Sequence, residues 1–406
     1  MTKIGYFIPE FPGQTHIFFW RERCALLERG VQLELVSTRR PPRNIISHEW
    51  AKEAMELTEY LATPKPATLA SAVAQLARSM PAGWARCVRS MARAEGLGPK
   101  GRVRLLGLAL VGAHLADLAR SRGWTHVHVH SCADAAHVAL FAHLLSGLPY
   151  SLTLHGPLRD YGPNQREKWR HAQFAVVITQ KLLREVTVQL AGSLPPVVDV
   201  APMGVDLASF VRKTPYAPWS GEGPLKIFSC GRLNFCKGHE DLIRAVGILR
   251  ERGLDARLSI AGEDEAGGTG HRKVLEAQIN KSRLDDPVAL LGAVSEKRVH
   301  TELDAAHIFA LASLAEPLGV AIMEAMANET PIVVTNAGGV PELVEDGVDG
   351  LTVPPQRPDE LARRIEELAR DPRLALRLTE TARRKVERHF SSARSADLLA
   401  KRLRAL

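Results

Sequence analysis

Short apolar segments alternate with longer amphipathic ones along the first half of the chain. The short segments are rich in β-branched and aromatic residues, which predicts strands. They are Lys3–Ile8, Gln32–Val36, His126–His130, Tyr150–Leu154, Ala175–Ile178 and Val197–Ala201. Apolar positions recur at helical spacing between most of them. The predicted helices include Phe19–Arg29, Val103–Arg122 and Ala133–Leu145. Strands that alternate with helices indicate a mostly parallel sheet that is covered on both faces.

The same alternation starts again in the second half, after the Pro- and Gly-containing stretch Thr214–Gly223. The predicted strands there are Leu225–Ser229, Arg257–Ala261, Val288–Leu291, His307–Leu311, Pro331–Val334 and Leu351–Val353. We therefore predict an α/β protein of two doubly wound, Rossmann-like domains that face each other across a cleft, where ligands bind. The predicted division is 1–214, 215–385, and a C-terminal helix at 386–406 that packs back on the first domain.

A basic helical insert, at about residues 55–105, interrupts the first domain. Arg78 to Arg104 contains seven basic residues against one acidic residue, Glu95. Trp84, Val88 and Met91 recur in it at helical spacing. Two interpretations stay open: a solvated insert whose apolar stripe packs on the domain, or an amphipathic surface that contacts anionic lipid.

Composition excludes several classes of protein. With 406 residues, 45% of them hydrophobic and 24% charged, the chain is expected to fold rather than to be disordered. The net charge of +8 suggests an anionic partner: nucleic acid, a membrane face or a phosphorylated small molecule. Five scattered cysteines without Cys-x-x-Cys spacing favour neither a disulfide framework nor a zinc ribbon, and point to the cytoplasm. We expect no secretory signal, because a strand begins at once. The longest apolar run, 105–116, is too short for a bilayer.

The segment Ala315–Met326 follows a predicted strand and has the features of a phosphate-binding helix start. Pro317 sits where a helix would take its first residue, because no N–H is needed there. The amides of Leu318, Gly319 and Val320 would then be unpaired donors of the first turn. Gly319 would also let an anion approach the backbone. These features predict a phosphate site.

Two glutamates flank this predicted phosphate site. Glu324 lies five residues beyond Gly319, roughly 7–8 Å along the axis at ~1.5 Å per residue. At that distance from a diphosphate, its carboxylate can accept hydrogen bonds from two ribose hydroxyls. Glu316 precedes the helix and would point at the sugar on the other phosphate.

A second loop, Gly231–Gly238, follows the first predicted strand of the second domain. It places two cations, Arg232 and Lys237, five residues apart between glycines. Arg232 can fork around a diphosphate and Lys237 can act as a point charge. Both would also neutralise the charge that builds up on a departing diphosphate.

Together these segments resemble the retaining glycosyltransferases of family four, which have the GT-B architecture. The family pattern Gly-Arg-Leu-x-x-x-Lys-Gly is met at Gly231–Gly238, and Glu-x7-Glu at Glu316 and Glu324. The segment Gly338–Glu342 is also typical. The resemblance covers most of the chain. It implies an N-terminal acceptor-binding domain and a C-terminal nucleotide-sugar-binding domain.

The first half is similar to the enzymes that build colanic acid and related exopolysaccharides. That similarity rests on a His-x-His segment, His128–Ser131, and on Ser151–Gly156, a strand that ends in an active-site histidine. It implies that His155 faces the donor sugar from the N-terminal domain. The product expected from such an enzyme is an exopolysaccharide or another cell-surface glycan.

In the second half, the resemblance implies that Arg232 and Lys237 hold the donor diphosphate. It further implies that Glu324 binds the ribose and that Glu316 binds the hydroxyls of the transferred sugar. Backbone around Gly292–Val294 would line the base. The predicted catalytic residues are therefore His155, Arg232, Lys237 and Glu316. The predicted donor-binding residues are Gly13, Arg232, Lys237, Val294, Glu316, Leu318, Gly319, Val320 and Glu324.

The loop Pro9–His16 departs from the family, since it has Pro12-Gly13 where many members have a Gly-Gly pair. The loop follows the first strand, so it faces the predicted cleft. Residues 13–16 are predicted to open a helix and to meet the donor phosphate or the acceptor. Gly13 is assigned to the donor; the acceptor contacts are Gln14, Thr15 and His16. A second departure follows His155, where relatives place an aspartate closer than Asp160. Both departures bear on the identity of the acceptor.

The implied reaction moves a hexose from a nucleotide-diphosphate sugar to a glycan or lipid-linked acceptor, with retention at the anomeric carbon. In a front-face route, the leaving diphosphate oxygen takes the acceptor proton. No metal ion is expected, because no Asp-x-Asp motif lies near the site residues, and no cofactor is expected beyond the nucleotide-sugar substrate. We expect a cytoplasmic protein, with the inner face of the plasma membrane as a further location, and no nucleic-acid partner.

Two alternative functions stay open. A sugar-nucleotide epimerase or hydrolase of the same fold would consume donor without an acceptor. A basic lipid- or nucleic-acid-binding protein would ignore sugar nucleotides and lose affinity steeply with salt. A dehydrogenase is disfavoured, because no Gly-x-Gly-x-x-Gly follows the first strand of either domain.

Overall fold

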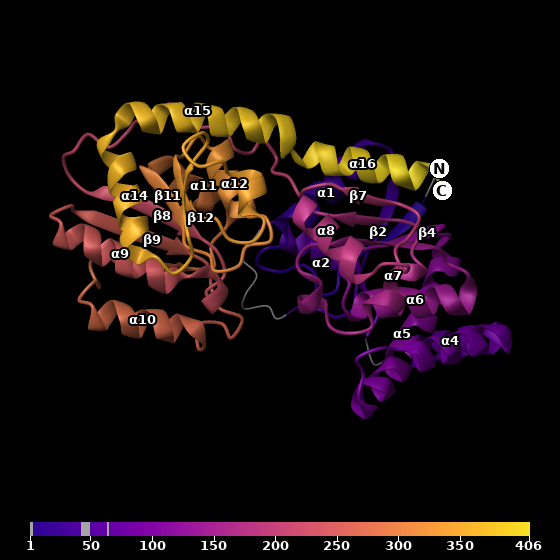
Figure 1. Cartoon of the computed structure of the whole chain (residues 1–406). Helices are drawn as coiled ribbons and strands as arrows, with labels where there is room; N and C mark the ends of the chain where they lie inside the picture. The colour runs from indigo at the N-terminus through magenta and orange to yellow at the C-terminus, as the bar shows by residue number, and fades with distance from the viewer. Residues whose placement is uncertain (1–2, 42–48, 63–64) are drawn as a thin grey trace.

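The chain folds into two α/β halves that lie side by side and are bridged by its two last helices (Figure 1). This computed structural model describes residues 3–41, 49–62 and 65–406. The N-terminal half is built on a seven-stranded sheet in the order β3-β2-β1-β4-β5-β6-β7. Its strand pairs are all parallel. The strands are β1 (Lys3–Phe7), β2 (Gln32–Ser37), β3 (Thr58–Tyr60), β4 (His126–Val129), β5 (Tyr150–Leu154), β6 (Ala175–Val177) and β7 (Val198–Val200).

Helices cover both faces of this sheet, and the middle strands β4, β5 and β6 are accordingly buried along their whole length. The helices are α1 (Ile17–Glu28), α2 (Ala51–Leu57), α3 (Pro66–Ser79), α4 (Ala82–Arg93), α5 (Pro99–Arg122), α6 (Asp134–Ser146), α7 (Gln165–Arg170) and α8 (Gln180–Gln189). The insert predicted between the second and third strands forms α3, α4 and the start of α5, and it also supplies the edge strand β3. This three-residue strand, which pairs with β2, was not predicted.

The C-terminal half has a six-stranded parallel sheet in the order β10-β9-β8-β11-β12-β13. Its strands are β8 (Leu225–Cys230), β9 (Ala256–Ala261), β10 (Val288–Gly292), β11 (Ile308–Leu311), β12 (Ile332–Thr335) and β13 (Leu351–Val353). Its helices are α9 (His239–Glu251), α10 (His271–Lys281), α11 (Glu296–Ala305), α12 (Val320–Ala327), α13 (Val340–Leu343), α14 (Pro358–Arg370) and α15 (Pro372–His389). The predicted pair of doubly wound domains is confirmed.

The first strand of each half lies inside its sheet, between the second strand and a later one. The order therefore reverses at β1 and at β8, which makes each a switch point. In open parallel sheets a crevice forms at such a point, at the carboxyl ends of the strands. The loops that follow β1, β4, β8 and β11 consequently open toward one another.

The last helix, α16 (Ser392–Arg404), leaves the C-terminal half and packs on α1. Leu399 and Leu403 join the buried cluster that contains Leu26 of α1. A bidentate ion pair adds to this contact, since Arg402 reaches both carboxylate oxygens of Asp199 at 2.6 and 2.8 Å. Figure 1 shows α15 and α16 running across the top of both halves.

The chain thus crosses between the halves twice, and the two crossings are bonded to each other. The amide of Val205 donates to the carbonyl of Phe390 at 2.9 Å, and the amide of Ser392 donates to the carbonyl of Val205 at 3.0 Å. Gly204 sits against the other crossing, where a β-carbon would come within 2.1 Å of the Ser391 carbonyl carbon. Only glycine fits there.

Within the described ranges, every helix is too short or too polar to cross a lipid bilayer.

Candidate active site in the interdomain cleft

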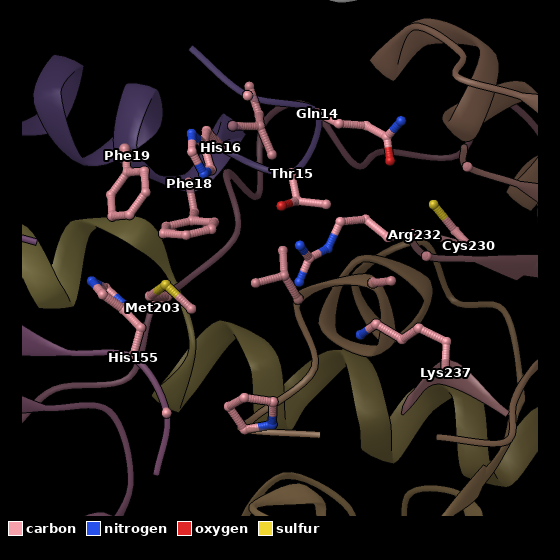
Figure 2. Close-up of a pocket in the computed structure, with 18 of the residues that line it drawn as sticks. Gln14, Thr15, His16, Phe18, Phe19, His155, Met203, Cys230, Arg232 and Lys237 are labelled. Atoms are coloured by element: carbon pink, nitrogen blue, oxygen red, sulfur yellow. The ribbon is translucent and has the colours of Figure 1, made fainter. Parts of the chain in front are cut away.

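A cavity of about 890 Å³ lies between the two halves. Loops after β1, β4 and β5 form one wall, and loops after β8, β9, β10 and β11 form the other. Figure 2 shows the aromatic rings of Phe18 and Phe19 beside His155 on one side, with Arg232 and Lys237 on the other. An aromatic wall therefore faces a cationic wall. Such a cleft suits a ligand with an apolar or sugar part and an anionic part.

Lys237 ends a short 3₁₀ helix, Phe235–Lys237, just after β8. Its ammonium lies 2.5 Å from Oε2 of Glu316, and the hydroxyl of Ser313 donates to the same oxygen at 3.1 Å. The side chain of Lys237 is 19% exposed and that of Glu316 is 7% exposed. The predicted diphosphate cation and the predicted sugar carboxylate are therefore neighbours, and each neutralises the other.

Arg232 is the more accessible of the two predicted clamp residues. Its guanidinium donates to Glu265 at 2.7 Å, and its side chain is 43% exposed. Close backbone packing holds its loop, because a β-carbon on Gly262 would lie 1.9 Å from the carbonyl oxygen of Gly231. An exposed pair of this kind contributes little to stability, so Arg232 can exchange Glu265 for an entering anion at small cost.

The predicted helix start at Pro317 is wrong, because α12 begins at Val320. Gly319 has φ +103°, a conformation that cannot continue into a right-handed helix, so the helix starts one residue later. Leu318, Gly319 and Val320 all line the cavity nevertheless. The backbone amides predicted to bind a phosphate thus lie in the turn before α12 and at its first residue, not in the first turn of a helix that starts at Pro317.

A glycine pair in the loop after β12 holds this turn in place. The amide of Gly339 donates to the carbonyl of Glu316 at 2.8 Å. A β-carbon on Gly338 would lie 2.0 Å from that carbonyl oxygen, and one on Gly339 would lie 2.0 Å from the carbonyl oxygen of Pro317. The pair belongs to a segment that the sequence marked only as typical of the family. Its structural role is to let the two backbones touch.

Glu324 lies in α12 and lines the cavity, but it is already engaged by Arg21 of α1. Nη1 of Arg21 lies 2.9 Å from Oε1 of Glu324, and Nη2 lies 2.5 Å from Oε1 of Glu296. Burial opposes the charge of Arg21, but the two carboxylates outweigh it and hold its pKa above the ordinary value. Burial also raises the pKa of Glu324, and Arg21 counteracts only part of that shift.

Arg21 is a residue that the sequence did not identify. It occupies a buried position on α1, and its partners lie about three hundred residues away in the chain. A buried arginine in an otherwise apolar stripe needs a carboxylate partner, which is the only signal that could have singled it out. The predicted ribose carboxylate is thus also part of the contact between the two domains.

His155 follows β5 and points into the cavity from the N-terminal side (Figure 2). Its Nε2 lies 3.2 Å from Nδ1 of His130. On the other edge of that ring, Nε2 of His130 lies 3.2 Å from Oε2 of Glu22, an oxygen to which Tyr6 donates at 2.6 Å. A row of polar groups therefore leads from the cavity into the N-terminal core.

Burial holds these two histidines neutral. It lowers the pKa of His155 to about 3, with a smaller effect from His16. It also lowers the pKa of His130 well below the ordinary value. A neutral imidazole has one donor and one acceptor nitrogen. His155 can therefore position a hydroxyl by a hydrogen bond, but it does not bring a positive charge to the site at neutral pH.

The loop after β1 lines the cavity with Gly13, Gln14, Thr15 and His16. Residues 13–16 were predicted to open a helix, and α1 begins directly after them, at Ile17, with His16 as its N-cap residue. These residues form a turn, in which the His16 amide donates to the Gly13 carbonyl at 3.1 Å. Gln14 reaches across the cleft, where its side-chain oxygen lies 3.5 Å from the amide of Glu263.

Other residues that line the cavity were not predicted from the sequence or were predicted only as backbone contacts. Phe18, Phe19 and Met203 lie near His155, with ring centroids of Phe18 and Phe19 at 5.6 and 5.2 Å from that of His155. Val294 lines the cavity after β10, where base contacts were predicted. Among the described side chains, no group of three or more His, Cys, Asp or Glu residues is arranged to hold a metal ion.

Comparisons with known proteins agree with this geometry. Residues 218–385 match the family model described as glycosyl transferases group 1. A protein described as a colanic acid biosynthesis glycosyltransferase, WcaL of Escherichia coli, is 27% identical over the whole of both chains. Its Salmonella typhimurium counterpart is 32% identical over 58% of this chain and 57% of its own length. The alpha-D-kanosaminyltransferase of Streptomyces kanamyceticus is 35% identical over 42% of this chain and 43% of its own length.

Solved structures agree on the fold. Anabaena Alr3699/HepE in complex with UDP and glucose has a TM-score of 0.76 over the whole of both chains, at 19% identity. A sucrose-phosphate synthase from Thermosynechococcus elongatus has a TM-score of 0.73 over the whole of both chains, at 17% identity. At these identities the likeness concerns the fold alone.

Proposed function

We propose that the protein transfers a sugar from a nucleotide-diphosphate donor to a glycan or lipid-linked acceptor. The proposal starts from the match of residues 218–385 to the model of group 1 glycosyl transferases and from the GT-B fold of the whole chain. One observation carries the proposal. The pair formed by Lys237 and Glu316 lies at one wall of a cavity whose opposite wall presents His155. The cavity is therefore equipped for an anion on one side and for hydroxyls on the other.

In this proposal the donor diphosphate lies against Arg232 and Lys237, with the amides of Leu318, Gly319 and Val320 as further donors. The anion takes over cations that now pair with Glu265 and Glu316. Once its cation is shared, the Glu316 carboxylate is available to accept hydrogen bonds from the hydroxyls of the transferred sugar. The ribose lies at Glu324 and the base beside Val294, while Gly13 contacts the phosphates from the N-terminal loop.

The proposed reaction retains the anomeric configuration. The bond between the anomeric carbon and the diphosphate oxygen breaks, and its electron pair leaves with the nucleoside diphosphate. An acceptor hydroxyl forms the new bond on the same face, and its proton passes to the leaving oxygen. Lys237 and Arg232 stabilise the charge on that oxygen, which is the usual task of fixed cations in such sites. We propose that these cations serve without a metal ion or other cofactor.

His155 positions the sugar rather than donating a proton, because burial keeps its ring neutral. The aromatic rings of Phe18 and Phe19 exclude water from the same wall. The turn of Gln14, Thr15 and His16 is placed to contact the acceptor as it enters.

The likeness to two proteins described as colanic acid glycosyltransferases supports an acceptor from exopolysaccharide or other cell-surface glycan synthesis. We further propose a hexosyl donor and a cytoplasmic site of action. A sugar-nucleotide epimerase or hydrolase is the alternative within this fold.

An experiment in two steps tests the proposal and distinguishes a glycosyltransferase from an epimerase or hydrolase. The protein is first screened for thermal stabilisation by a panel of UDP-, GDP- and ADP-sugars, since a ligand that binds only the folded state raises the melting temperature. The stabilising donor is then incubated with and without membrane-extracted glycolipid acceptors. We expect release of the nucleoside diphosphate only with an acceptor. Release without any acceptor would point to a hydrolase, and no stabilisation by any donor would contradict the proposal.

A further inference from the structure

Large apolar side chains stay exposed on three consecutive helices of the N-terminal half. Of the 17 exposed large hydrophobic residues among those described, eight lie between residues 69 and 110, so they are concentrated rather than scattered. They include Leu69 and Val73 on α3, Trp84 and Val88 on α4, and Val103 and Leu106 on α5. We call these residues and the basic side chains around them the insert surface.

Each of these helices also has a separate buried face, so the exposed residues are not a misplaced core. On α4 the buried positions are Gly83, Cys87 and Ser90, while Trp84 and Val88 recur four residues apart on another side. A helix that only packs on a domain needs one apolar stripe. The second stripe is unexplained by the fold.

The three helices contact one another, which places their exposed residues in one region. The indole of Trp84 donates to the carbonyl of Leu76 at 3.0 Å and so lies across the junction between α3 and α4. In Figure 1, α4 and α5 lie at the outer end of the N-terminal half, away from the C-terminal half. The insert surface is therefore free to meet a large partner while the cleft stays open.

Positive charge accompanies the exposed apolar residues. Residues 78–104 hold seven basic residues and one acidic residue. Arg78 and Arg104 pair with aspartates of neighbouring helices. For Arg89, Arg93 and Lys100, no carboxylate lies within ion-pair distance in the part of the chain that the structure describes. Their charge remains uncompensated, and Arg89 directly follows the exposed Val88 on α4.

This combination selects one kind of partner. A second copy docked through the same face would bring Arg89, Arg93 and Lys100 against the same cations of its partner, because a two-fold interface is self-complementary. Nucleic acid would satisfy the charges but would leave the apolar rows in water. An anionic bilayer satisfies both, since it offers phosphates to the arginines and acyl chains to the apolar side chains.

We propose that the insert surface binds the face of an anionic lipid bilayer, with the apolar side chains of α3, α4 and α5 in the headgroup region and the basic residues at the phosphates. This binding involves neither the donor nor the cleft. The lipid proposal can therefore be tested independently of the proposed glycosyltransferase reaction.

Flotation of the full chain with lipid vesicles tests the proposal. The vesicles are made either of phosphatidylcholine alone or of phosphatidylcholine with phosphatidylglycerol. We expect binding to the anionic vesicles, weakening as salt is raised, and at least tenfold less binding to phosphatidylcholine alone. Equal binding to both, or none to the anionic vesicles at low salt, would overturn the proposal.

Matched variants locate the contact. Val88→Asp with Val103→Asp is expected to lower vesicle binding at least tenfold. Val188→Asp with Val274→Asp changes other exposed valines, on α8 and α10, and should leave binding unchanged. Arg89→Gln with Arg93→Gln should reduce binding about tenfold or more, whereas Arg373→Gln with Arg377→Gln on α15 should not. Control pairs that lose as much binding as the insert pairs would contradict the assignment.

Two further measurements keep the test independent of folding and function. Thermal stabilisation by the donor should be the same in all four variants, because none of the changed residues lines the cleft. Light scattering without lipid should give the same mass for the wild type and for Val88→Asp with Val103→Asp. If the wild type is a dimer and this variant is a monomer, the insert surface binds a second copy of the chain, and the lipid proposal is overturned.

Discussion

The guanidinium of Arg21 lies 2.9 Å from the carboxylate of Glu324, and this contact joins the N-terminal domain to the C-terminal domain. Both side chains are almost fully buried, at 6% and 11% exposed. A buried ion pair is costly to break from one side, because the remaining charge loses its partner and stays out of water. The contact between the two domains therefore depends on Glu324, a residue of the proposed donor site.

Arg21→Met is expected to lower the free energy of unfolding by about 3–5 kcal/mol. The deficit should be larger at pH 8 than at pH 5, because the buried Glu324 of the variant can take up a proton in acid and shed its unpaired charge. Urea unfolding at both pH values measures this. Arg298→Met removes an exposed pair with Glu302 and should cost about 0–1 kcal/mol. If both variants lose the same free energy of unfolding, the pair between the two domains contributes no more to stability than an exposed ion pair does.

Lys237→Ala is expected to lower kcat for sugar transfer by about 10²–10³-fold, because the departing diphosphate loses a fixed cation. The melting temperature should fall only slightly, because Glu316 loses its cation but keeps the hydrogen bond from Ser313. Lys273→Ala, an exposed position on α10, serves as the control. A wild-type rate in Lys237→Ala would remove this residue from the mechanism.

Glu324→Ala should differ from Lys237→Ala in one respect. It is expected to abolish transfer and also to destabilise the fold, because it takes one of the two carboxylate partners from Arg21. Calorimetry with and without donor separates the two effects. If the variant keeps the wild-type melting temperature and loses donor binding, the ion pair is dispensable and the ribose contact alone explains the residue.

His130→Asn is expected to lower kcat by about 10–100-fold with little change in KM for the donor. That range is found where an outer partner that orients a histidine ligand is removed. The reason is that His130 faces the ring of His155 and fixes which of its nitrogens carries the proton. His126→Asn is a matched control, because His126 is equally buried in β4 but bonds Ser151 instead. Equal effects in both variants would mean that packing, not orientation, is responsible.

The buried histidines should make the protein sensitive to acid. The pKa of His126 and that of His155 are lowered by burial to about 3, from 6.5 for an unfolded histidine. Between these values the unfolded chain binds more protons, so stability is full above pH 6.5 and falls as the pH drops toward 3. Each such histidine contributes a slope of about 1.4 kcal/mol per pH unit. His126→Gln should flatten the slope by one such increment, as measured by urea unfolding across this pH range.

The alternation of strands and helices was enough to predict two doubly wound domains and a cleft, because each short apolar run had to be buried on both faces. The loops at Gly231–Gly238 and Glu316–Glu324 were also placed correctly at one cleft, because both follow strands of one parallel sheet. The helix start at Pro317 was predicted wrongly because the backbone of Glu316 and Pro317 packs against Gly338 and Gly339 of another loop, and Gly319 then takes a left-handed conformation.

Contacts between distant segments could not be predicted from local pattern. Arg21 lies in an otherwise apolar stripe of α1, which signals a buried partner but does not reveal that two glutamates of the other domain provide it. The strand β3 has only three residues and lies at an edge, so its burial pattern is too short to stand out. Phe18 and Phe19 read as core residues of α1, yet both also line the cavity.

The position of α16 has a consequence for the order in which the protein can be made. Leu399 and Leu403 complete the core that contains Leu26, although some 370 residues separate them in the chain. During translation the N-terminal domain emerges before the C-terminal domain, but it lacks this helix until residues 392–404 leave the ribosome. The apolar face of α1 that packs on α16 therefore stays exposed to solvent while the whole C-terminal domain is synthesised. The domain that is translated first is the last to be completed, and an N-terminal fragment expressed alone would lack part of its own core.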